Sequence, residues 1–208
     1  MHGWRQSLVL GPIFFLLYVD DVTLAYLGAV RYKLFADDLK IYSNVDSSCA
    51  SLNVQTALCE LEHWCQTWQL QVNLYKTSVV HLGTKNPHVS YSFNNRTIVC
   101  DESVRDLSII VDSGLTFDVH INNVVSRAYA RTAMLFRGFS TQNITLLRRA
   151  YIMYVCPILE YASNVWNPHL LKHINALERV QRHFTKQITV LRNLSYDERL
   201  ARLELDTL

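Results

Sequence analysis

The sequence predicts an α+β fold in which antiparallel hairpins with packed helices come first and a helical region follows. Up to residue 119, short segments alternate polar and apolar residues and are separated by turn residues. From residue 120 onward, apolar residues recur at helical spacing. The 208 residues are 50% hydrophobic and 18% charged, which is enough to bury a core and too apolar for disorder. We therefore expect two domains, residues 1–119 and residues 120–208.

Charge is distributed unevenly between these two parts. The net charge is only +2, but residues 1–119 hold 8 Lys/Arg against 12 Asp/Glu, whereas residues 120–208 hold 12 against 6. A basic helical half can attract phosphate groups. The five cysteines are odd in number and contain no C-x-x-C, so neither a disulfide framework nor a zinc knuckle is indicated, and a reducing intracellular compartment is favoured.

The segment LVLGPIFFLLYV, preceded by Arg5, has the charged and apolar parts of a secretory signal. Gly11 and Pro12 interrupt the apolar run, which ends at Asp20 and Asp21 and is too short to span a bilayer. We predict instead a buried helix with Pro12 in its first turn, and we expect no membrane association. The two aspartates of YVDD would then be solvated at the exposed end of this helix. A signal peptide is the alternative.

A second Asp-Asp pair, in RYKLFADDLKIYS, has a different setting. The flanks YKLF and LKIY alternate polar and apolar residues, which predicts two strands joined by a tight turn. Asp37 and Asp38 would lie on one side of the hairpin tip, where paired carboxylates can hold a divalent cation for nucleotidyl transfer. The alternative is a turn in which aspartate is present for its turn propensity alone.

Downstream of this hairpin, the sequence predicts a helix and then further strands. One face of an amphipathic helix has 4, 3, 4, 3 spacing, with Ser51 as its N-cap, and consists of Val54, Leu58, Leu61, Cys65 and Trp68, with Trp64 beside them. We interpret both tryptophans as core anchors and not as platforms for base stacking. HVSYSFNNRTIVC predicts a hairpin with Asn94 and Asn95 at its turn, and LSIIVDSGL predicts another strand.

The second half contains three segments with helical periodicity: NNVVSRAYARTAMLFRGF, NITLLRRAYIMYVCPILEYA and LLKHINALERVQRHFTKQITVLRNL. Their basic residues suit phosphate binding without sequence readout, and the alternative is an ordinary solvated face. In HLLKH, His169 and His173 have the i, i+4 spacing of metal ligands. Without a glutamate or a third ligand, they are more simply two surface histidines near a helix start.

Five segments carry a family resemblance: LVLGPIFFLLYVDDV, KLFADDLKIY, LEHWCQTWQLQVNLYKTSVVHLG, DLSIIVDSGLTFDVHI, and PILEYASNVWNP together with INALERVQRHFTKQI. In this order they resemble the reverse transcriptases of non-LTR retrotransposons (LINE elements), particularly the jockey-like and chicken-repeat-like groups. The resemblance covers nearly the whole chain. It implies a partial right-hand polymerase palm in residues 1–119, with a Gly-rich turn remnant, the FADD hairpin, an N-x-x-K element and a primer-grip-like strand. Residues 120–208 would be a helical thumb and connector.

The resemblance also implies roles for individual residues. Asp37 and Asp38 would be the catalytic, metal-binding residues, with Asp38 supporting the site, whereas YVDD only imitates the motif. Nucleotide and template would contact Gln6, Gly11, Phe35, Ala36 and Lys76, the lysine of VNLYK. The primer-grip-like residues would be His81, Leu82 and Gly83. The nucleic-acid backbone would contact Arg127, Arg131, Arg148, Arg149, Arg179, Arg182 and Lys186.

The family's reaction is RNA-directed DNA synthesis by two-metal nucleotidyl transfer. This implies Mg²⁺ or Mn²⁺ as the cofactor, and an RNA template, a DNA primer and deoxynucleotide triphosphates as the partners. The family's life cycle implies an intracellular location, in the nucleus, the cytoplasm or both. Asp112 is not expected to join the site, because the family's corresponding segment lies outside the active site.

The sequence also departs from the family pattern. In the Gly-rich turn, Arg5, Ser7 and Leu8 replace the family's Pro, second Gly and Ser, and a side chain there can obstruct the template and nucleotide. The family's other catalytic aspartate and the fingers would lie upstream of this sequence. We therefore expect the chain to be inactive alone and to need an upstream polymerase segment. The alternatives are a non-catalytic RNA- or DNA-binding remnant and a non-functional fossil open reading frame.

Overall fold

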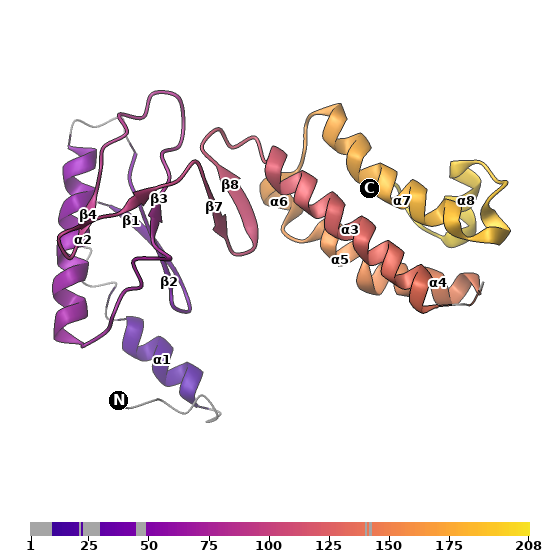
Figure 1. The fold of residues 1–208 in the computed structure, drawn as a ribbon. Coiled ribbons are helices and arrows are strands. Elements are labelled where there is room, and N and C mark those ends of the chain that lie inside the picture. The colour runs from indigo at the N-terminus through magenta and orange to yellow at the C-terminus, as the bar shows by residue number, and fades with distance from the viewer. Residues whose placement is uncertain (1–9, 21, 23–29, 45–48, 140, 142) are drawn as a thin grey trace. The chain divides into compact units, whose positions relative to one another are not determined.

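The computed structural model describes residues 10–20, 22, 30–44, 49–139, 141 and 143–208 (Figure 1). The chain divides into two compact units, Met1–Glu102 and Ser103–Leu208. Short two-stranded sheets combine with helices, so the predicted α+β class is confirmed. The division lies earlier than the predicted one after residue 119. The reason is that Ile109, on the strand before the helices, packs into the core of the helical unit.

The first unit alternates helices with short strands. It contains α1 (Gly11–Asp20), β1 (Arg31–Phe35), β2 (Asp38–Tyr42), α2 (Ala50–Thr67), β3 (Ser78–Val79), β4 (Ser92–Phe93), β5 (Arg96–Thr97) and β6 (Val99–Cys100). Strands β1 and β2 pair antiparallel, as do β4 and β5, while β3 and β6 pair parallel. The hairpins at FADD and at Asn94–Asn95 are therefore confirmed, and the parallel pair is an addition to the prediction.

Helix α2 supplies most of the core of this unit. Leu58, Leu61 and Cys65 are buried and pack with Phe93 and Ile98. Half-buried side chains of β1 and β2 complete the core, namely Tyr32, Leu34, Leu39 and Ile41. The predicted amphipathic helix is thus confirmed, because its 3.6-residue period places one apolar face against the strands. The predicted cap is wrong, since the helix begins at Ala50 with Cys49 as its N-cap and Ser51 lies inside it.

Helix α1 is present as predicted, but the prediction that it is buried is wrong. Ile13, Phe14 and Leu17 are 53%, 61% and 66% exposed, and only Val19 of the helix is buried. Its apolar side chains lie on all sides, whereas a helix packed on one neighbour needs only one apolar stripe. Among the described residues, no helix is long and apolar enough to cross a membrane. The helix therefore presents an unusually large apolar surface to solvent.

We expect the double change Phe14→Glu and Leu17→Glu to reduce self-association, because it places charge on the most exposed apolar positions of α1. Sedimentation velocity at micromolar concentration should change from a mixture of large species to a single slow species. Leu52→Glu is the matched control, because Leu52 is an isolated exposed leucine on α2, also 66% exposed. An unchanged distribution in the double variant would show that another surface drives association.

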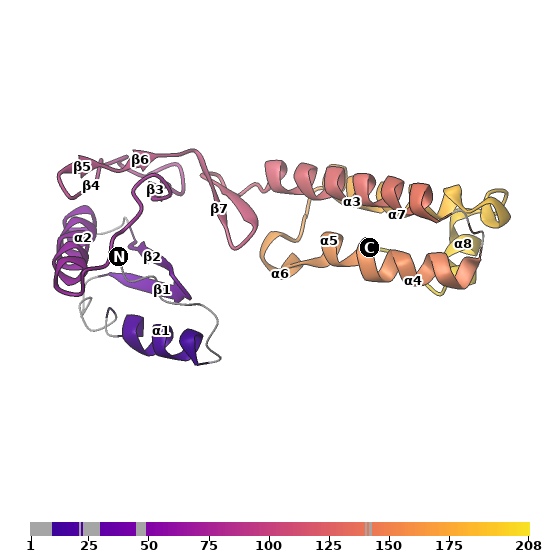
Figure 2. The same cartoon turned by 60° about the horizontal axis from the view of Figure 1, so that its bottom comes forward.

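The second unit consists of a hairpin and a set of helices (Figure 2). It contains β7 (Ser103–Asp106), β8 (Ile109–Asp112), α3 (Asp118–Gly138), α4 (Ile144–Tyr154), α5 (Cys156–Glu160), α6 (Ser163–Trp166), α7 (Leu171–Gln187), the 3₁₀ helix η2 (Thr189–Leu191) and α8 (Tyr196–Leu203). Helices α3 and α7 lie side by side and form one layer, α4 and α5 lie across from them, and α8 closes one end.

The core of this unit is aromatic at its centre. Tyr151 and Phe184 are fully buried, with ring centroids 4.4 Å apart, and Phe136 lies 5.3 Å from Phe184. Gln181 accepts a hydrogen bond from the Tyr151 hydroxyl at 2.9 Å and donates to the Asp206 carbonyl at 2.7 Å. Because a buried amide must be paired, this glutamine fixes the C-terminal residues onto α7.

Two of the predicted helical segments are interrupted. The second splits into α4 and α5 around Val155 and Pro157, because a proline ring removes a hydrogen bond and crowds the preceding turn. The third ends at Gln187, where Ile188 adopts an extended conformation, φ −73° and ψ 110°. Beyond it, Ser195 and Glu198 form a reciprocal capping box that starts α8.

Two hairpins have turns with left-handed backbone at both central residues. In the β4–β5 turn, Asn94 and Asn95 have φ of 50° and 57°. In the β7–β8 turn, Leu107 and Ser108 have φ of 43° and 71°. This is the type I′ pattern, which matches the twist of the strands and favours asparagine and glycine. Asparagine therefore suits the first turn, while leucine and serine strain the second.

Ser108→Gly is expected to raise the free energy of unfolding of the helical unit by about 1 kcal/mol, because glycine adopts positive φ without a Cβ clash. Thermal or denaturant unfolding followed by circular dichroism would measure the gain. Ser103→Gly, the same chemical change at the first residue of β7, serves as control and should not raise stability, since an extended residue gains no relief of strain from glycine. A loss of stability in both variants would contradict the strain at Ser108.

Candidate active site

The FADD hairpin presents two carboxylates at its tip. Phe35 pairs with Asp38 across the strands, so Ala36 and Asp37 form a two-residue turn. Both aspartates are exposed, and within the described residues neither carboxylate has a hydrogen bond or an ion pair. Ala36 has φ of 53°, a conformation that costs an alanine about 1–2 kcal/mol. The local fold thus holds a strained turn and leaves both carboxylates free for a ligand.

The outward face of the same hairpin is basic, which the sequence interpretation overlooked. Lys33 and Lys40 lie directly opposite each other across the strands, and Arg31 lies on the same face two pairs further from the tip. The sequence does contain a signal for this basic face, because polar residues occupy every second position of the strand. The carboxylates of Asp37 and Asp38 therefore lie next to a face that favours phosphates.

The N-x-x-K element forms a turn shaped by its asparagine. The Asn73 side chain accepts a hydrogen bond from the Tyr75 N–H at 3.0 Å. The Asn73 carbonyl accepts from the Lys76 N–H and the Thr77 hydroxyl, each at 3.0 Å. Lys76 is exposed on this turn. Asparagine is thus explained as the residue that bends the chain, and its hydrogen bonds leave the lysine amine facing solvent.

The primer-grip-like residues have three different environments. The strand predicted over VVHLG ends at Val79, because the paired strand β6 offers only two residues, so that prediction is wrong beyond Val79. His81 is buried, with its ring 4.8 Å from the ring of His88. Leu82 is 44% exposed, and Gly83 has φ of 82°, where glycine avoids strain.

The predicted residues near the N-terminus are only partly described. Gly11 begins α1, with open space where a Cβ would lie. Asp20 ends the same helix and is exposed, as predicted. Gln6, the substituted positions Arg5, Ser7 and Leu8, and Asp21 lie outside the described residues.

Asp112 has a structural task, in agreement with the prediction that it stays outside the site. Its carboxylate accepts hydrogen bonds from the N–H groups of Gly114, Thr116 and Phe117 and from the Thr116 hydroxyl. Partial burial acts to raise the pKa of Asp112, but these hydrogen bonds outweigh it and lower the pKa below its ordinary value. The carboxylate is therefore fully used in shaping the loop that begins α3.

The basic residues of the helical unit fall into two groups. Arg148 forms an ion pair with Glu204 at 3.0 Å, and the Arg182 guanidinium lies 4.6 Å from the centre of the Tyr196 ring. These two arginines hold the C-terminal segment in place. The other predicted residues are exposed, as Arg182 also is: Arg127 and Arg131 on α3, Arg149 on α4, and Arg179 and Lys186 on α7. The exposed group is the one available to phosphates.

The two histidines of HLLKH do not form a metal pair. Helix α7 begins at Leu171, so His169 lies before it and only His173 belongs to the helix. His173 is buried, which corrects its interpretation as a surface residue, and its Nε2 lies 2.6 Å from Asp118 Oδ1. Lys172 contacts the other oxygen of Asp118 at 2.9 Å. Hydrogen bonds from Lys172 and then His173 lower the pKa of Asp118. The contacts of Asp118 with Lys172 and His173 therefore join the first turns of α3 and α7.

The side chains at the FADD tip can be compared with the ligands that a divalent metal ion requires. Among the described residues, no group of three or more His, Cys, Asp or Glu side chains converges. Mg²⁺ needs no such cluster, because it keeps several waters and accepts one or two carboxylates together with substrate phosphates. Two exposed aspartates with hard oxygen donors fit this requirement, so Asp37 and Asp38 are the residues suited to hold the ion.

Two exposed carboxylates that can hold a divalent cation suit phosphoryl transfer assisted by metal ions, as in polymerases and nucleases. The chain belongs to the reverse transcriptase family, because residues 1–139 match the family described as "Reverse transcriptase (RNA-dependent DNA polymerase)". The predicted family is thereby confirmed. Members of this family are nucleotidyltransferases that typically use divalent metals.

Individual proteins show the same relationship. The chain is 28% identical over 201 residues to the probable RNA-directed DNA polymerase from transposon BS of Drosophila melanogaster, covering 90% of this chain and 22% of that protein. With the polymerase of the mobile element jockey, from the same organism, the identity is 24% over 198 residues, with the same coverage. The uncharacterised Caenorhabditis elegans protein B0403.1 is 36% identical over 107 residues, 50% of this chain and 54% of that protein. No solved structure was found to match. The chain spans about a fifth of the polymerases it resembles.

Proposed function

We propose that this chain is part of an RNA-directed DNA polymerase and that Asp37 and Asp38 are its metal-binding carboxylates. The observation that carries the proposal is the FADD tip, where a hairpin holds two exposed aspartates that lack partners among the described residues. Both strands around the tip are anchored in the core by alternate side chains, such as Leu34 and Leu39. A metal site needs this rigidity, because small displacements of a reacting group lower the rate steeply.

Each neighbouring element has a role in this proposal. A divalent cation held there would neutralise the charge that builds up on the phosphates during nucleotidyl transfer. Arg31 and Lys33 of the basic face would hold the phosphate backbone next to the carboxylates, and Lys76 would approach the triphosphate from its turn. The first unit would correspond to part of a polymerase palm, and the helices of the second unit to a thumb that contacts an RNA–DNA hybrid.

A second candidate function is nucleic-acid binding without catalysis. It is favoured by the exposed arginines of α3 and α7, whose surface does not depend on the FADD tip. Extension of a DNA primer on an RNA template, with the upstream polymerase segment supplied, in Mg²⁺ or Mn²⁺ and with a chelator as control, separates the two. Metal-dependent extension supports the polymerase. Hybrid binding without extension supports the binding module. If a folded chain shows neither extension nor hybrid binding, both candidate functions are contradicted.

Salt dependence provides a further prediction about the helical unit. We expect Arg127→Ala together with Arg131→Ala to weaken hybrid binding and to reduce the slope of log affinity against log salt by about 1–2, since each lost phosphate contact removes about 0.7–0.9 from the slope. Filter binding or fluorescence anisotropy over a salt series measures this slope. Arg192→Ala, an exposed arginine beyond α7, is the control with the same chemical change. Equal slopes in wild type and double variant would remove both residues from the interface.

A further inference from the structure

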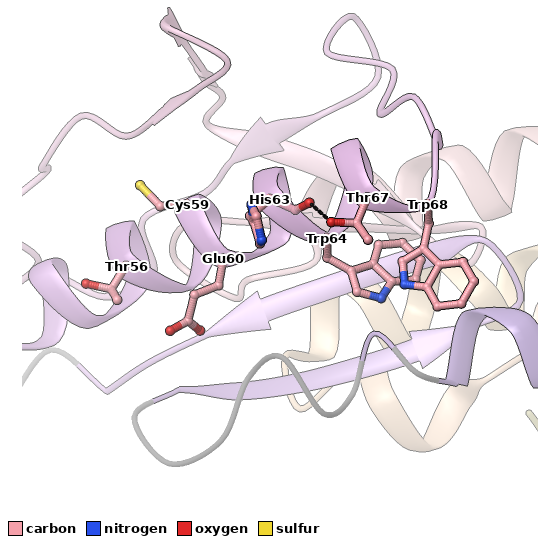
Figure 3. A pocket seen from close by; sticks show the side chains of 7 residues that line it. All are labelled: Thr56, Cys59, Glu60, His63, Trp64, Thr67 and Trp68. Atoms are coloured by element: carbon pink, nitrogen blue, oxygen red, sulfur yellow. Dashed lines mark hydrogen bonds between the residues drawn. The ribbon is translucent and has the colours of Figure 1, made fainter.

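Helix α2 carries a hollow lined by side chains that have no part in the proposed polymerase chemistry. The hollow has a volume of about 510 Å³ and is lined by Thr56, Cys59, Glu60, His63, Trp64, Thr67 and Trp68 (Figure 3). A volume of this size is within the range of small-ligand sites, about 300–1,000 Å³. Glu60, Trp64 and Trp68 extend from the same side of the helix, while Cys59 extends from the other.

Three aromatic rings meet at this site. The Tyr18 ring lies 5.2 Å from Trp68 and 6.5 Å from Trp64, and the two indole rings are 6.4 Å apart. Trp64 packs against the core, but Trp68 is 41% exposed and is bound through its carbonyl to the Tyr18 hydroxyl at 2.7 Å. The prediction that both tryptophans are core anchors is therefore right for Trp64 and wrong for Trp68. An exposed indole at a hollow offers a π face to a ligand.

The charge of the hollow selects the ligand. Among the described residues of its lining, there is the Glu60 carboxylate and no lysine or arginine. Within the described residues, the exposed Glu60 side chain has no hydrogen bond or ion pair. The Thr67 hydroxyl already donates to the His63 carbonyl at 2.9 Å, as the dashed line in Figure 3 shows, so it contributes no free donor. A carboxylate without a counter-cation repels phosphates and attracts a cation.

We propose that this hollow binds an arginine side chain presented by a peptide segment of another protein. A guanidinium plane stacks on an indole face and at the same time pairs with a carboxylate, and it is more weakly hydrated than the ammonium of lysine. The negative lining disfavours a nucleic acid, whose bases would stack but whose phosphates would face Glu60. The site is separate from the FADD tip and does not depend on polymerase activity.

The test uses the full chain and a pair of matched peptides, acetyl-Gly-Gly-Arg-Gly-Gly-amide and the same peptide with citrulline in place of arginine. Indole N–H signals in ¹H–¹⁵N spectra report the binding. The Trp64 and Trp68 signals should shift in a saturable way, while the signal of Trp166, a buried tryptophan that donates to the Tyr161 carbonyl, should not shift. Citrulline has nearly the same shape without the charge, and its peptide should bind at least tenfold more weakly.

Two variants complete the test. Glu60→Gln should weaken arginine-peptide binding at least fivefold, and the loss should shrink as salt concentration rises. Glu102→Gln removes an equal charge from an exposed position outside the hollow and should change binding less than twofold. Equal binding of the citrulline peptide, equal effects of the two variants, or tighter binding of a short oligothymidylate at the same tryptophans would overturn the proposal.

Discussion

Replacing Asp37 with asparagine is expected to lower Mn²⁺ affinity by at least about tenfold and to abolish metal-dependent primer extension when the upstream polymerase segment is supplied. The substitution keeps the size and hydrogen-bonding shape of the side chain and removes only its charge, so the two-residue turn should form unchanged. An amide oxygen is a much weaker ligand for a hard cation than a carboxylate. Broadening of peptide resonances by bound Mn²⁺ measures the affinity without relying on extension, so the metal site can be tested whether or not the chain extends a primer.

The look-alike YVDD provides the control for this experiment. Asp20 is an exposed carboxylate at the end of α1, next to a second aspartate in the sequence, and Asp20→Asn makes the same chemical change. We expect this variant to keep Mn²⁺ binding, and to keep extension when the upstream polymerase segment is supplied. Asp38→Asn should fall between the two, because Asp38 begins β2 beside the turn and adds a second carboxylate. Loss of Mn²⁺ binding in Asp20→Asn but not in Asp37→Asn would reverse the assignment of the two motifs.

Local chemistry explains which features the sequence could predict. The FADD and Asn94–Asn95 hairpins follow from alternation around a turn, which a few neighbouring residues determine. The fold of α2 follows in the same way from its apolar spacing. Asp112 was kept out of the site on the family resemblance alone, but its loop role is also local, because an aspartate before Ser-Gly is a common start of a loop in which the side chain accepts N–H groups. In each case the residues that decide the structure are close in sequence.

Features that depend on distant residues could not be predicted. Arg148 and Arg182 were expected to contact nucleic acid, and nothing in their own segments indicates that Glu204 and Tyr196 would bind them. The exposure of α1 was equally hidden, because an apolar helix is usually buried and its sequence does not say what covers it. A count of arginines thus overestimates a phosphate-binding surface, since some of these cations act within the fold.

We expect Asp112→Ala to lower the free energy of unfolding of the helical unit by about 2 kcal/mol. The carboxylate holds a loop in which Leu115 and Phe117 have φ of 53° and 56°, so its hydrogen bonds offset backbone strain directly before α3. Alanine would leave three N–H groups without their acceptor. Denaturant unfolding of the variant measures the loss, and Asp206→Ala, which removes an exposed carboxylate from the same unit, should cost much less.

The stabilisation by Asp112 should depend on pH with a defined sign. The folded state lowers the pKa of this carboxyl, so the unfolded state binds its proton more readily. The contribution is then fully present above the unfolded pKa, about 3.9, and disappears as pH falls through the lower folded value. The stability difference between wild type and Asp112→Ala should therefore be constant near neutral pH and narrow below about pH 4. A difference that instead grew on acidification would mean that the neutral carboxyl, not the carboxylate, holds the loop.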